Sequence, residues 1–228
     1  MAQVISGLVL ASASPRRLDL LKSINIIPEL IQASEIDESC KKKENPISYC
    51  KRLAKEKGDF VFDQFPTKNI LSADTIVICG RKIFGKPRDH LEAKKFLNFF
   101  SGRKHTVVTA IYLKNEKFNK LKIVSSKVTF KKLDQNDIDD YLQTDEWRNK
   151  AGAYAIQGYA ERFVKTLNGS YSNVVGLPLY QVFNLLKSAT RPIYNEVLER
   201  GHNTGDSHIS QYKKAGGALR HHPCLGNQ

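Results

Sequence analysis

The sequence has no apolar run long enough to cross a membrane. Its longest apolar runs, residues 71–79 and 96–100 among them, fall well short of the ~20 residues that a membrane-spanning helix needs. No basic residue precedes an apolar stretch within residues 1–6, so no secretory signal is visible. The sequence therefore predicts a cytoplasmic protein without a membrane partner.

Cysteine is scarce and follows no pattern. The chain has 4 cysteines, Cys40, Cys50, Cys79 and Cys224, and none of them forms a CxxC pair. Such pairs are the usual sign of a zinc site or a redox centre. Without a secretory signal, reduced thiols are favoured over disulfides.

Acidic residues are outnumbered. The chain has 36 Lys and Arg against 23 Asp and Glu, a net charge of +13, and such a field attracts nucleotides, nucleic acids or membrane surfaces. The basic residues are seldom clustered, so a compositional bias spread over solvated faces explains the excess equally well. Neither a nucleic-acid-binding motif nor a basic stripe interleaved with aromatic residues is present, so we expect no nucleic-acid partner.

The composition is that of a globular protein. The 228 residues are 41% hydrophobic and 26% charged, which excludes a disordered chain, a collagen-like chain and a disulfide scaffold. Strand-like runs alternate with helical periodicity, and two of the strands form a hairpin, so we expect an α/β domain with a mixed sheet. Strands are predicted over residues 7–11, 27–31, 70–79, 105–113 and 121–130, and short strands or strand ends over 153–156 and 163–167. A turn is predicted over 81–87, and helices from residue 15 and over 46–62, 91–99, 134–142 and 177–186.

The C-terminal part of the chain differs from the rest. From residue 189 the apolar periodicity fades, and Gly, His and Asn accumulate. The irregular spacing of these histidines and Cys224 fits no metal-ligand pattern. We therefore expect a folded domain over residues 1–188 and a poorly ordered or appended tail over residues 189–228.

The first candidate site is the segment SASPRR at residues 12–17. Ser14 can cap a helix whose first residue is Pro15. The N–H groups at the start of that helix and the guanidinium groups of Arg16 and Arg17 together suit a phosphate. Taken alone, a capped helix with two surface arginines is the simpler explanation.

The second candidate is Asp74, which stands with Thr75 inside the apolar run of residues 70–79. A buried ionised carboxylate is costly unless it is paired or binds a metal. Alternatively, Asp74 lies where the strand opens to solvent, and ligands of α/β proteins bind at the carboxyl ends of strands. Both interpretations favour a functional role.

Two weaker candidates follow along the chain. The turn Gly85-Lys86-Pro87 presents a lysine without the frame of a Walker A loop, and an ordinary exposed lysine is its simpler explanation. Residues 151–158 combine small residues and glycines, which permit close approach of the backbone to a ligand. A tight bend explains that segment equally well.

Taken together and in this order, these segments resemble the Maf family of nucleoside triphosphate pyrophosphatases. The resemblance covers about residues 7–188. The motifs SPRR, ADT and AIQG resemble those of the subgroup that acts on dTTP and UTP rather than on 7-methyl-GTP. Gly58 departs from the family's usual alanine, and residues 80–84 are a variable turn. The matching segments are LASASPRR (10–17), IDES (36–39), RLAKEK (52–57), SADTIV (72–77), FGKPRD (84–89), KAGAYAIQG (150–158) and GSYSNVVGLPL (169–179).

The resemblance implies a single Maf/ITPase-like domain, a mixed twisted sheet flanked by helices with a cleft for the nucleotide. It also implies cleavage of a nucleoside triphosphate between its α and β phosphates, which releases a monophosphate and pyrophosphate. Asp74 would be the proton acceptor that activates the attacking water. Glu38 and Asp74 can supply oxygen ligands to Mg²⁺ or Mn²⁺. The phosphates would be bound by Ser12, Arg17, Lys57 and Lys86.

The resemblance assigns the choice of base to Arg16, Thr75 and Gln157. A glutamine amide offers a donor and an acceptor, which match the O4 and N3–H edge of uracil or thymine. A base that did not match would leave buried polar groups unpaired. dTTP and UTP are the expected substrates, with modified pyrimidine nucleotides left open, and the expected role is to limit non-canonical nucleotides.

An alternative from another functional class stays open. A regulatory protein linked to cell division would bind the nucleotide without turnover, and the same residues would serve it. The sequence does not fix the oligomeric state, and a homodimer is compatible with it.

The proposed domain boundary leads to a first testable prediction. A protein that ends at about residue 188 should keep both its melting temperature and its activity, because apolar periodicity and family resemblance stop there. Thermal unfolding and an activity assay of the shortened and full-length proteins check this. A shortened protein that fails to fold would place the tail in the core.

Overall fold

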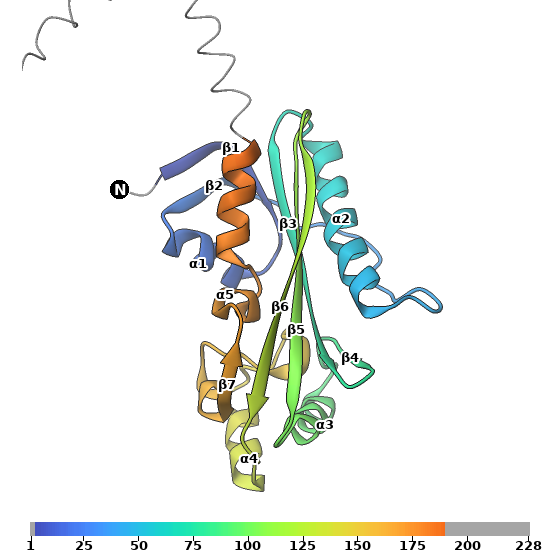
Figure 1. The fold of residues 1–228 in the computed structure, drawn as a ribbon, viewed down its shortest axis with the longest axis vertical. Helices are drawn as coiled ribbons and strands as arrows, with labels where there is room; N and C mark the ends of the chain where they lie inside the picture. Colours follow the sequence, from blue (N-terminus) through green and yellow to red (C-terminus); the bar gives the residue numbers. More distant parts are fainter. Residues whose placement is uncertain (1–2, 190–228) are drawn as a thin grey trace, which may run out of the picture. The chain divides into compact units, whose positions relative to one another are not determined.

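The computed structural model describes residues 3–189, with the backbone alone for residues 3–6 (Figure 1). The tail predicted over residues 189–228 lies outside the described residues, except for Ala189. Ala189 is buried beside Leu185 and Leu186, so the truncation is best made directly after it.

The domain is built on one mixed sheet with the strand order β2-β1-β3-β5-β6-β7, and β4 pairs with β3 off this path. The first three strands of this order run parallel, and β5, β6 and β7 follow antiparallel to their neighbours. The predicted mixed α/β fold is thereby confirmed. The strands are β1 (Gln3–Ala11), β2 (Ile26–Ile31), β3 (Asn69–Cys79), β4 (Lys82–Phe84), β5 (Lys104–Lys114), β6 (Asn119–Phe130) and β7 (Val164–Asn168).

The helices begin at residues that the sequence marks as starts. Pro15 is the first residue of its helix, and the side chains of Asn45, Asp89 and Asp134 each accept a hydrogen bond from the backbone N–H three residues on. The helical segments are α1 (Pro15–Ser23), α2 (Pro46–Gln64), α3 (His90–Phe100), α4 (Gln135–Gln143), α5 (Tyr171–Val175), the 3₁₀ turns η1 (Ala151–Ala153) and η2 (Tyr159–Phe163), and a helix that includes residues 179–189.

Two element predictions were wrong. Residues 153–156 are not a strand, because Gly152 and Ala153 have φ values of 72° and 58° and break the extended run into η1 and a turn. The predicted turn over residues 81–87 contains the short strand β4, which pairs with the end of β3. The short helix α5 was not predicted.

The two faces of the sheet are covered by different helices (Figure 1). On one face, Cys50 and Ala54 of α2 pack against Ile76, Val108 and Ala110 of β3 and β5. The opposite face carries α1 and the helix of residues 179–189, which together bury a second apolar cluster against β1, β3 and β5. Residues that alternate along β3 therefore face different helices.

Gly58 lets α2 approach the sheet closely. A Cβ at this position would lie 2.5 Å from Cδ1 of the buried Tyr112 and 2.7 Å from Oγ of Ser72. The Ser72 hydroxyl in turn donates to the carbonyl of Ala54 in α2 (2.6 Å). This close contact places the neighbouring Lys57 directly over the sheet.

β3 is paired differently along its two edges. One edge pairs with β5 from Ile70 to Ile78. The other edge pairs with β1 at Asn69–Ser72 and with β4 at Val77–Cys79. Within the described residues no strand pairs with that second edge at positions 73–76. The sheet therefore opens beside these four residues.

None of the helices found within residues 3–189 is both long enough and apolar enough to span a membrane.

Candidate active site

A pocket of about 400 Å³ lies beside the unpaired stretch of β3. Its walls come from the end of β1, the start of α1, the loop before α2, the turn after β4, and residues 149–157. All nine residues that the sequence singled out line it, although their separate roles stay predictions. They are Ser12, Arg16, Arg17, Glu38, Lys57, Asp74, Thr75, Lys86 and Gln157.

A shared ammonium group joins the two carboxylates of the pocket. Nζ of Lys57 lies 2.6 Å from Oδ1 of Asp74 and 2.9 Å from Oε1 of Glu38. Lys57 and Asp74 are both buried, so each charge needs the other to offset its loss of hydration. Burial disfavours the Glu38 carboxylate, but the hydrogen bond and charge of Lys57, together with the charges of Lys86 and Arg17, outweigh it and lower the pKa of Glu38.

Arg17 is held on the other face of β3. Its Nε donates to the carbonyl of Gly176 (2.9 Å), Nη1 to Oγ of Ser12 (3.0 Å) and Nη2 to Oγ1 of Thr75 (3.2 Å). Burial lowers the pKa of Arg17, and the charge of Asp74 opposes that shift. Three fixed partners hold this guanidinium at the pocket wall.

The Thr75 hydroxyl is part of this arrangement. Its oxygen lies 3.0 Å from Oγ1 of Thr109, its partner on β5, and Thr109 donates to the carbonyl of Asn173 (3.1 Å). Thr75 thus contacts Arg17, a predicted phosphate ligand, while its predicted part in base choice stays untested. Thr109 itself is fully buried, and the sequence signal for it was only a polar residue within an apolar run.

Arg16 and Lys150 form a second group of cations. Burial lowers the pKa of Arg16, and the neighbouring Arg17 adds to the shift. The pKa of Lys150 is also lowered, by burial first and then by the charge of Arg16. Gln157 and Tyr154 line the same pocket. Two cations that repel each other favour a ligand with oxygen acceptors.

The backbone fixes the wall that carries Lys150 and Gln157. Asn149 and Ala153 have φ values of 56° and 58°, which cost non-glycine residues ~1–3 kcal/mol each. A Cβ on Gly152 would lie 2.9 Å from Cγ2 of Val77. The N–H of Gly152 donates to the carbonyl of Gly85 (3.0 Å), next to Lys86. This wall and the Lys86 turn are therefore joined.

Sequence reasoning missed Lys150, although it begins the segment KAGAYAIQG, in which a lone charge among small residues was the available signal. It also missed Cys50, whose Sγ donates to the carbonyl of Asp74 (3.3 Å). Burial raises the pKa of the Cys50 thiol to about 12, so this thiol stays protonated and supports the strand rather than acting as a nucleophile.

The two predicted metal ligands, Glu38 and Asp74, have no third His, Cys, Asp or Glu side chain placed with them to hold a metal ion among residues 3–189. Glu38 and Asp74 nevertheless converge on one cation, the ammonium of Lys57. Mg²⁺ is commonly held by one or two carboxylates and completed by water and substrate phosphates. The donor set therefore fits such an ion together with a phosphate-bearing ligand.

The sequence model of the family described as "Maf-like protein" matches residues 7–189. This chain belongs to that family. Its sequence is 49% identical to a dTTP/UTP pyrophosphatase of Zymomonas mobilis and 42% identical to one of Ruegeria, each over 82% of this chain and over 94% and 97% of the relatives. A nucleoside triphosphate pyrophosphatase of Anaplasma phagocytophilum is 42% identical over 80% of this chain and 95% of that protein.

The Ham1 protein of Staphylococcus aureus aligns with a TM-score of 0.37 and 12% identity, over 56% of this chain and 71% of that one. Membership of the Maf-like family confirms the resemblance drawn from the seven sequence segments.

The buried ion pair generates a prediction about stability. Lys57→Met leaves the Asp74 carboxylate buried beside an apolar side chain, and loss of one partner of a buried pair typically costs ~3–5 kcal/mol. We expect the free energy of unfolding in urea to fall by about 3 kcal/mol. Lys57→Met combined with Asp74→Asn should lose less than Lys57→Met alone.

The matched control is Lys55→Met on the same helix, which removes an exposed ion pair with Asp59 and should cost less than ~1 kcal/mol. Equal effects at the two lysines would show that the Lys57–Asp74 pair contributes no more than a surface pair.

Proposed function

We propose that this protein hydrolyses nucleoside triphosphates, dTTP and UTP foremost, to a monophosphate and pyrophosphate. The observation that carries the proposal is one pocket that holds the buried carboxylate of Asp74, its ion-pair partner Lys57, and the cations Arg17 and Lys86. Relatives that share 42–49% of their residues with the chain are named as pyrophosphatases of this kind. Limiting non-canonical nucleotides is the role we infer.

The cations serve the phosphates. A triphosphate carries several negative charges, and charge develops on the pyrophosphate as it leaves. Fixed cations stabilise that charge without having to reorganise. Arg17 is already held by three hydrogen bonds, and the first turn of α1 lines the same pocket and adds the partial positive charge of a helix N-terminus. Lys86 reaches the pocket from the turn after β4.

Asp74 is the residue we assign to the attacking water. Within the described part of the chain, its Oδ1 holds Lys57, which leaves Oδ2 to orient the water and accept its proton. The ion pair with Lys57 offsets the buried charge of this carboxylate. A divalent ion such as Mg²⁺ or Mn²⁺, held by Glu38 and Asp74, would supply further positive charge to the phosphates.

Arg16, Thr75 and Gln157 are the residues we assign to base choice, with Lys150 beside them. The Gln157 amide presents a donor and an acceptor to the edge of a pyrimidine. Thr75 would act partly through Arg17, which it contacts. Base and phosphate recognition thus come from neighbouring parts of one wall.

The expected setting follows from the substrate. Nucleoside triphosphates are cytoplasmic metabolites, so we place the activity in the cytoplasm. The partner is the nucleotide rather than a nucleic acid. A homodimer is compatible with the site, whose nine predicted residues all belong to one chain.

Asp74→Asn should abolish turnover while the protein stays folded, because the amide keeps the shape but cannot accept a proton. A positioned base contributes ~10²–10⁴-fold, so the loss should lie in that range. The assay incubates wild type and variant with a nucleotide panel and Mg²⁺ or Mn²⁺ and identifies the products. Orthophosphate instead of pyrophosphate would indicate another phosphohydrolase, and binding without turnover by the wild type would favour a regulatory role.

Gln157→Glu should weaken hydrolysis of dTTP and UTP far more than overall stability. The carboxylate keeps the size of the amide but loses its N–H donor, so the O4 of the pyrimidine meets a repelling acceptor. Leaving such a group unpaired costs ~1–3 kcal/mol, and we expect kcat/KM to fall at least ~10-fold. Lys86→Ala is the control, since it should depress all triphosphates alike. An equal loss on every nucleotide for Gln157→Glu would assign Gln157 to the phosphates.

A further inference from the structure

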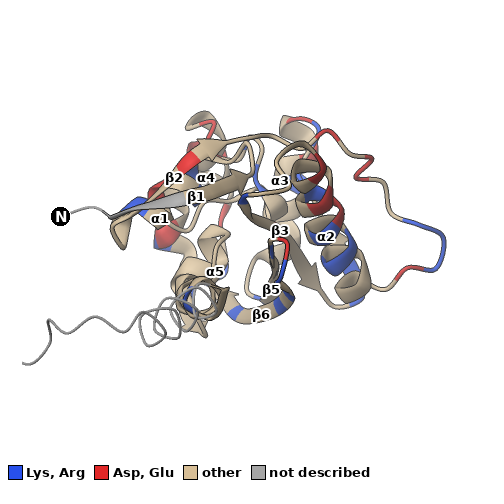
Figure 2. Cartoon of the chain, turned by 90° about the horizontal axis from the view of Figure 1, so that it is seen from above, with Lys and Arg blue, Asp and Glu red and all other residues tan. Residues whose placement is uncertain are grey.

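Glu38 reaches the pocket from a loop that has no regular structure of its own. The loop over residues 32–45 joins β2 to α2 and is neither helix nor strand. Charges of both signs lie on this loop and on α2 (Figure 2). The Glu38 side chain is 44% exposed, so burial alone does not hold it. Its position depends on what anchors the loop.

Arg52 of α2 contacts this loop at two residues. Its Nε and Nη2 donate to the two carboxylate oxygens of Glu44, each at 2.8 Å, and Nη2 also donates to the carbonyl of Ser39 (2.8 Å). Nη1 donates to Glu56 of the same helix (3.0 Å). The side chains of Arg52 and Glu44 are 14% and 10% exposed. This pair is therefore sheltered and bidentate, unlike an ordinary surface ion pair.

Tyr49 adds a second anchor one turn earlier. Its hydroxyl donates to the carbonyl of Glu38 (2.8 Å), and its ring lies 5.5 Å from the Arg52 guanidinium. The neighbouring carbonyls of Glu38 and Ser39 are thus both held by α2. The same helix carries Lys57, the counter-ion of the Glu38 side chain. One rigid element therefore fixes both the backbone and the carboxylate of Glu38.

We propose that Arg52 is a positioning residue that acts through Glu38. Arg52 does not line the pocket, yet its planar fork ties Ser39, the residue after Glu38, and Glu44, near the end of the loop, to α2. A lysine cannot replace it, because one ammonium group cannot serve both oxygens of Glu44 and the Ser39 carbonyl in that geometry. The inference rests on the proposed hydrolysis, in which Glu38 and Asp74 would hold the divalent ion that binds the phosphates.

The test is a double-mutant cycle in the full chain, with Arg52→Lys, Glu38→Gln and the double variant. We expect Arg52→Lys to lower kcat/KM about tenfold or more. In the double variant, kcat/KM should fall no further than about twofold below that of Glu38→Gln, because residues that act as a unit are not additive. Hydrogen exchange of the amides over residues 36–44 should become faster in Arg52→Lys, whereas that of β3 should not change.

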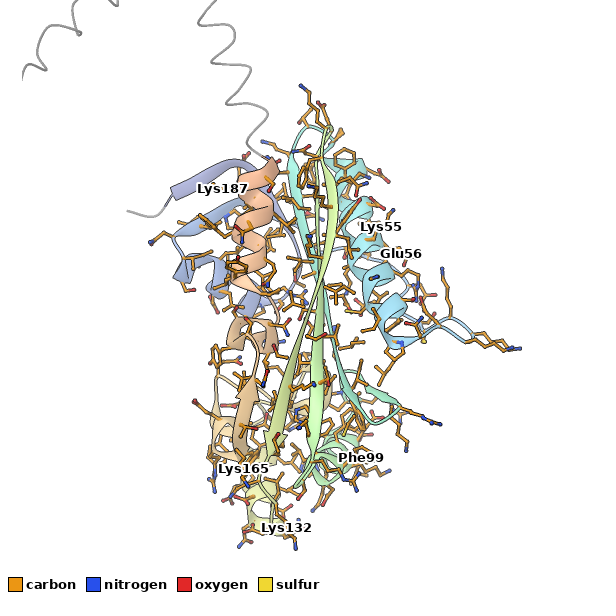
Figure 3. The ribbon with its side chains drawn as sticks, viewed as in Figure 1. Lys55, Glu56, Phe99, Lys132, Lys165 and Lys187 are labelled. Carbon is orange, nitrogen blue, oxygen red and sulfur yellow. The ribbon has the colours of Figure 1, made fainter. Side chains whose placement is uncertain are left out.

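The matched control is Lys55→Met, which changes a neighbouring charged side chain on α2 (Figure 3) that is paired with Asp59 instead of the loop. It should leave kcat/KM and loop exchange at wild-type values. Urea unfolding of each variant confirms that it is folded.

Three results would overturn the proposal: losses that multiply in the double variant, unchanged loop exchange in Arg52→Lys, or wild-type activity of Glu38→Gln. If the wild type turns over no triphosphate, the proposed function fails instead. The Kd of a non-hydrolysable dTTP analogue is then measured for the wild type, the two single variants and the double variant. Non-additive losses there would support Arg52, and additive losses would reject it.

Discussion

The site depends on one buried ammonium group that two carboxylates share. Lys57 comes from α2, Asp74 from the middle of the sheet, and Glu38 from a loop. Lys57 and Asp74 are both buried, and neither charge is stable there without a partner, because a buried ion loses hydration that only a close opposite charge replaces. The close packing of α2 at Gly58 brings the ammonium into reach. Helix, sheet and loop are therefore positioned by the same electrostatic requirement.

The sheet supplies the second constraint. β3 sends Asp74 toward α2 and Thr75 toward Arg17, since neighbouring side chains of a strand point to opposite faces. Side chains of both faces nevertheless line one pocket, because the edge of β3 that faces away from β5 pairs with no described strand at positions 73–76. The interruption between β1 and β4 thus joins two otherwise separate sets of charges.

Much of this was predictable from the residues. The start of α1 at Pro15, the apolar run of β3 with a carboxylate inside it, and the hairpin of β5 and β6 are local patterns, and the structure confirms them. The Ser14 side chain, however, makes no capping hydrogen bond to α1. The nine predicted site residues come from segments far apart in the sequence, and their common pocket was predicted only through the family resemblance. Residue types alone left ordinary structural explanations open for most of them.

The misses have physical causes. The composition of residues 153–156 predicts a strand, but Gly152 and Ala153 have positive φ values. Gly152 packs closely against Val77, which lies far away in the sequence. β4 is too short for periodicity to reveal, and it exists because the end of β3 offers an edge. Arg52 belongs to a segment with ordinary helical spacing. Its contacts with Glu44 and Ser39 depend on the path of the loop, which no periodicity describes.

The open edge of β3 has one more consequence. In a strand, alternate residues direct their main-chain N–H and C=O groups to the same edge, and buried groups of this kind require partners. Beside positions 73–76 such partners can be water or a bound molecule. Main-chain atoms are the same whatever the side chain, so part of the recognition in this pocket would persist through substitutions. An alanine scan would therefore account for less than the full binding free energy, and the shape of the sheet itself would be a determinant of affinity.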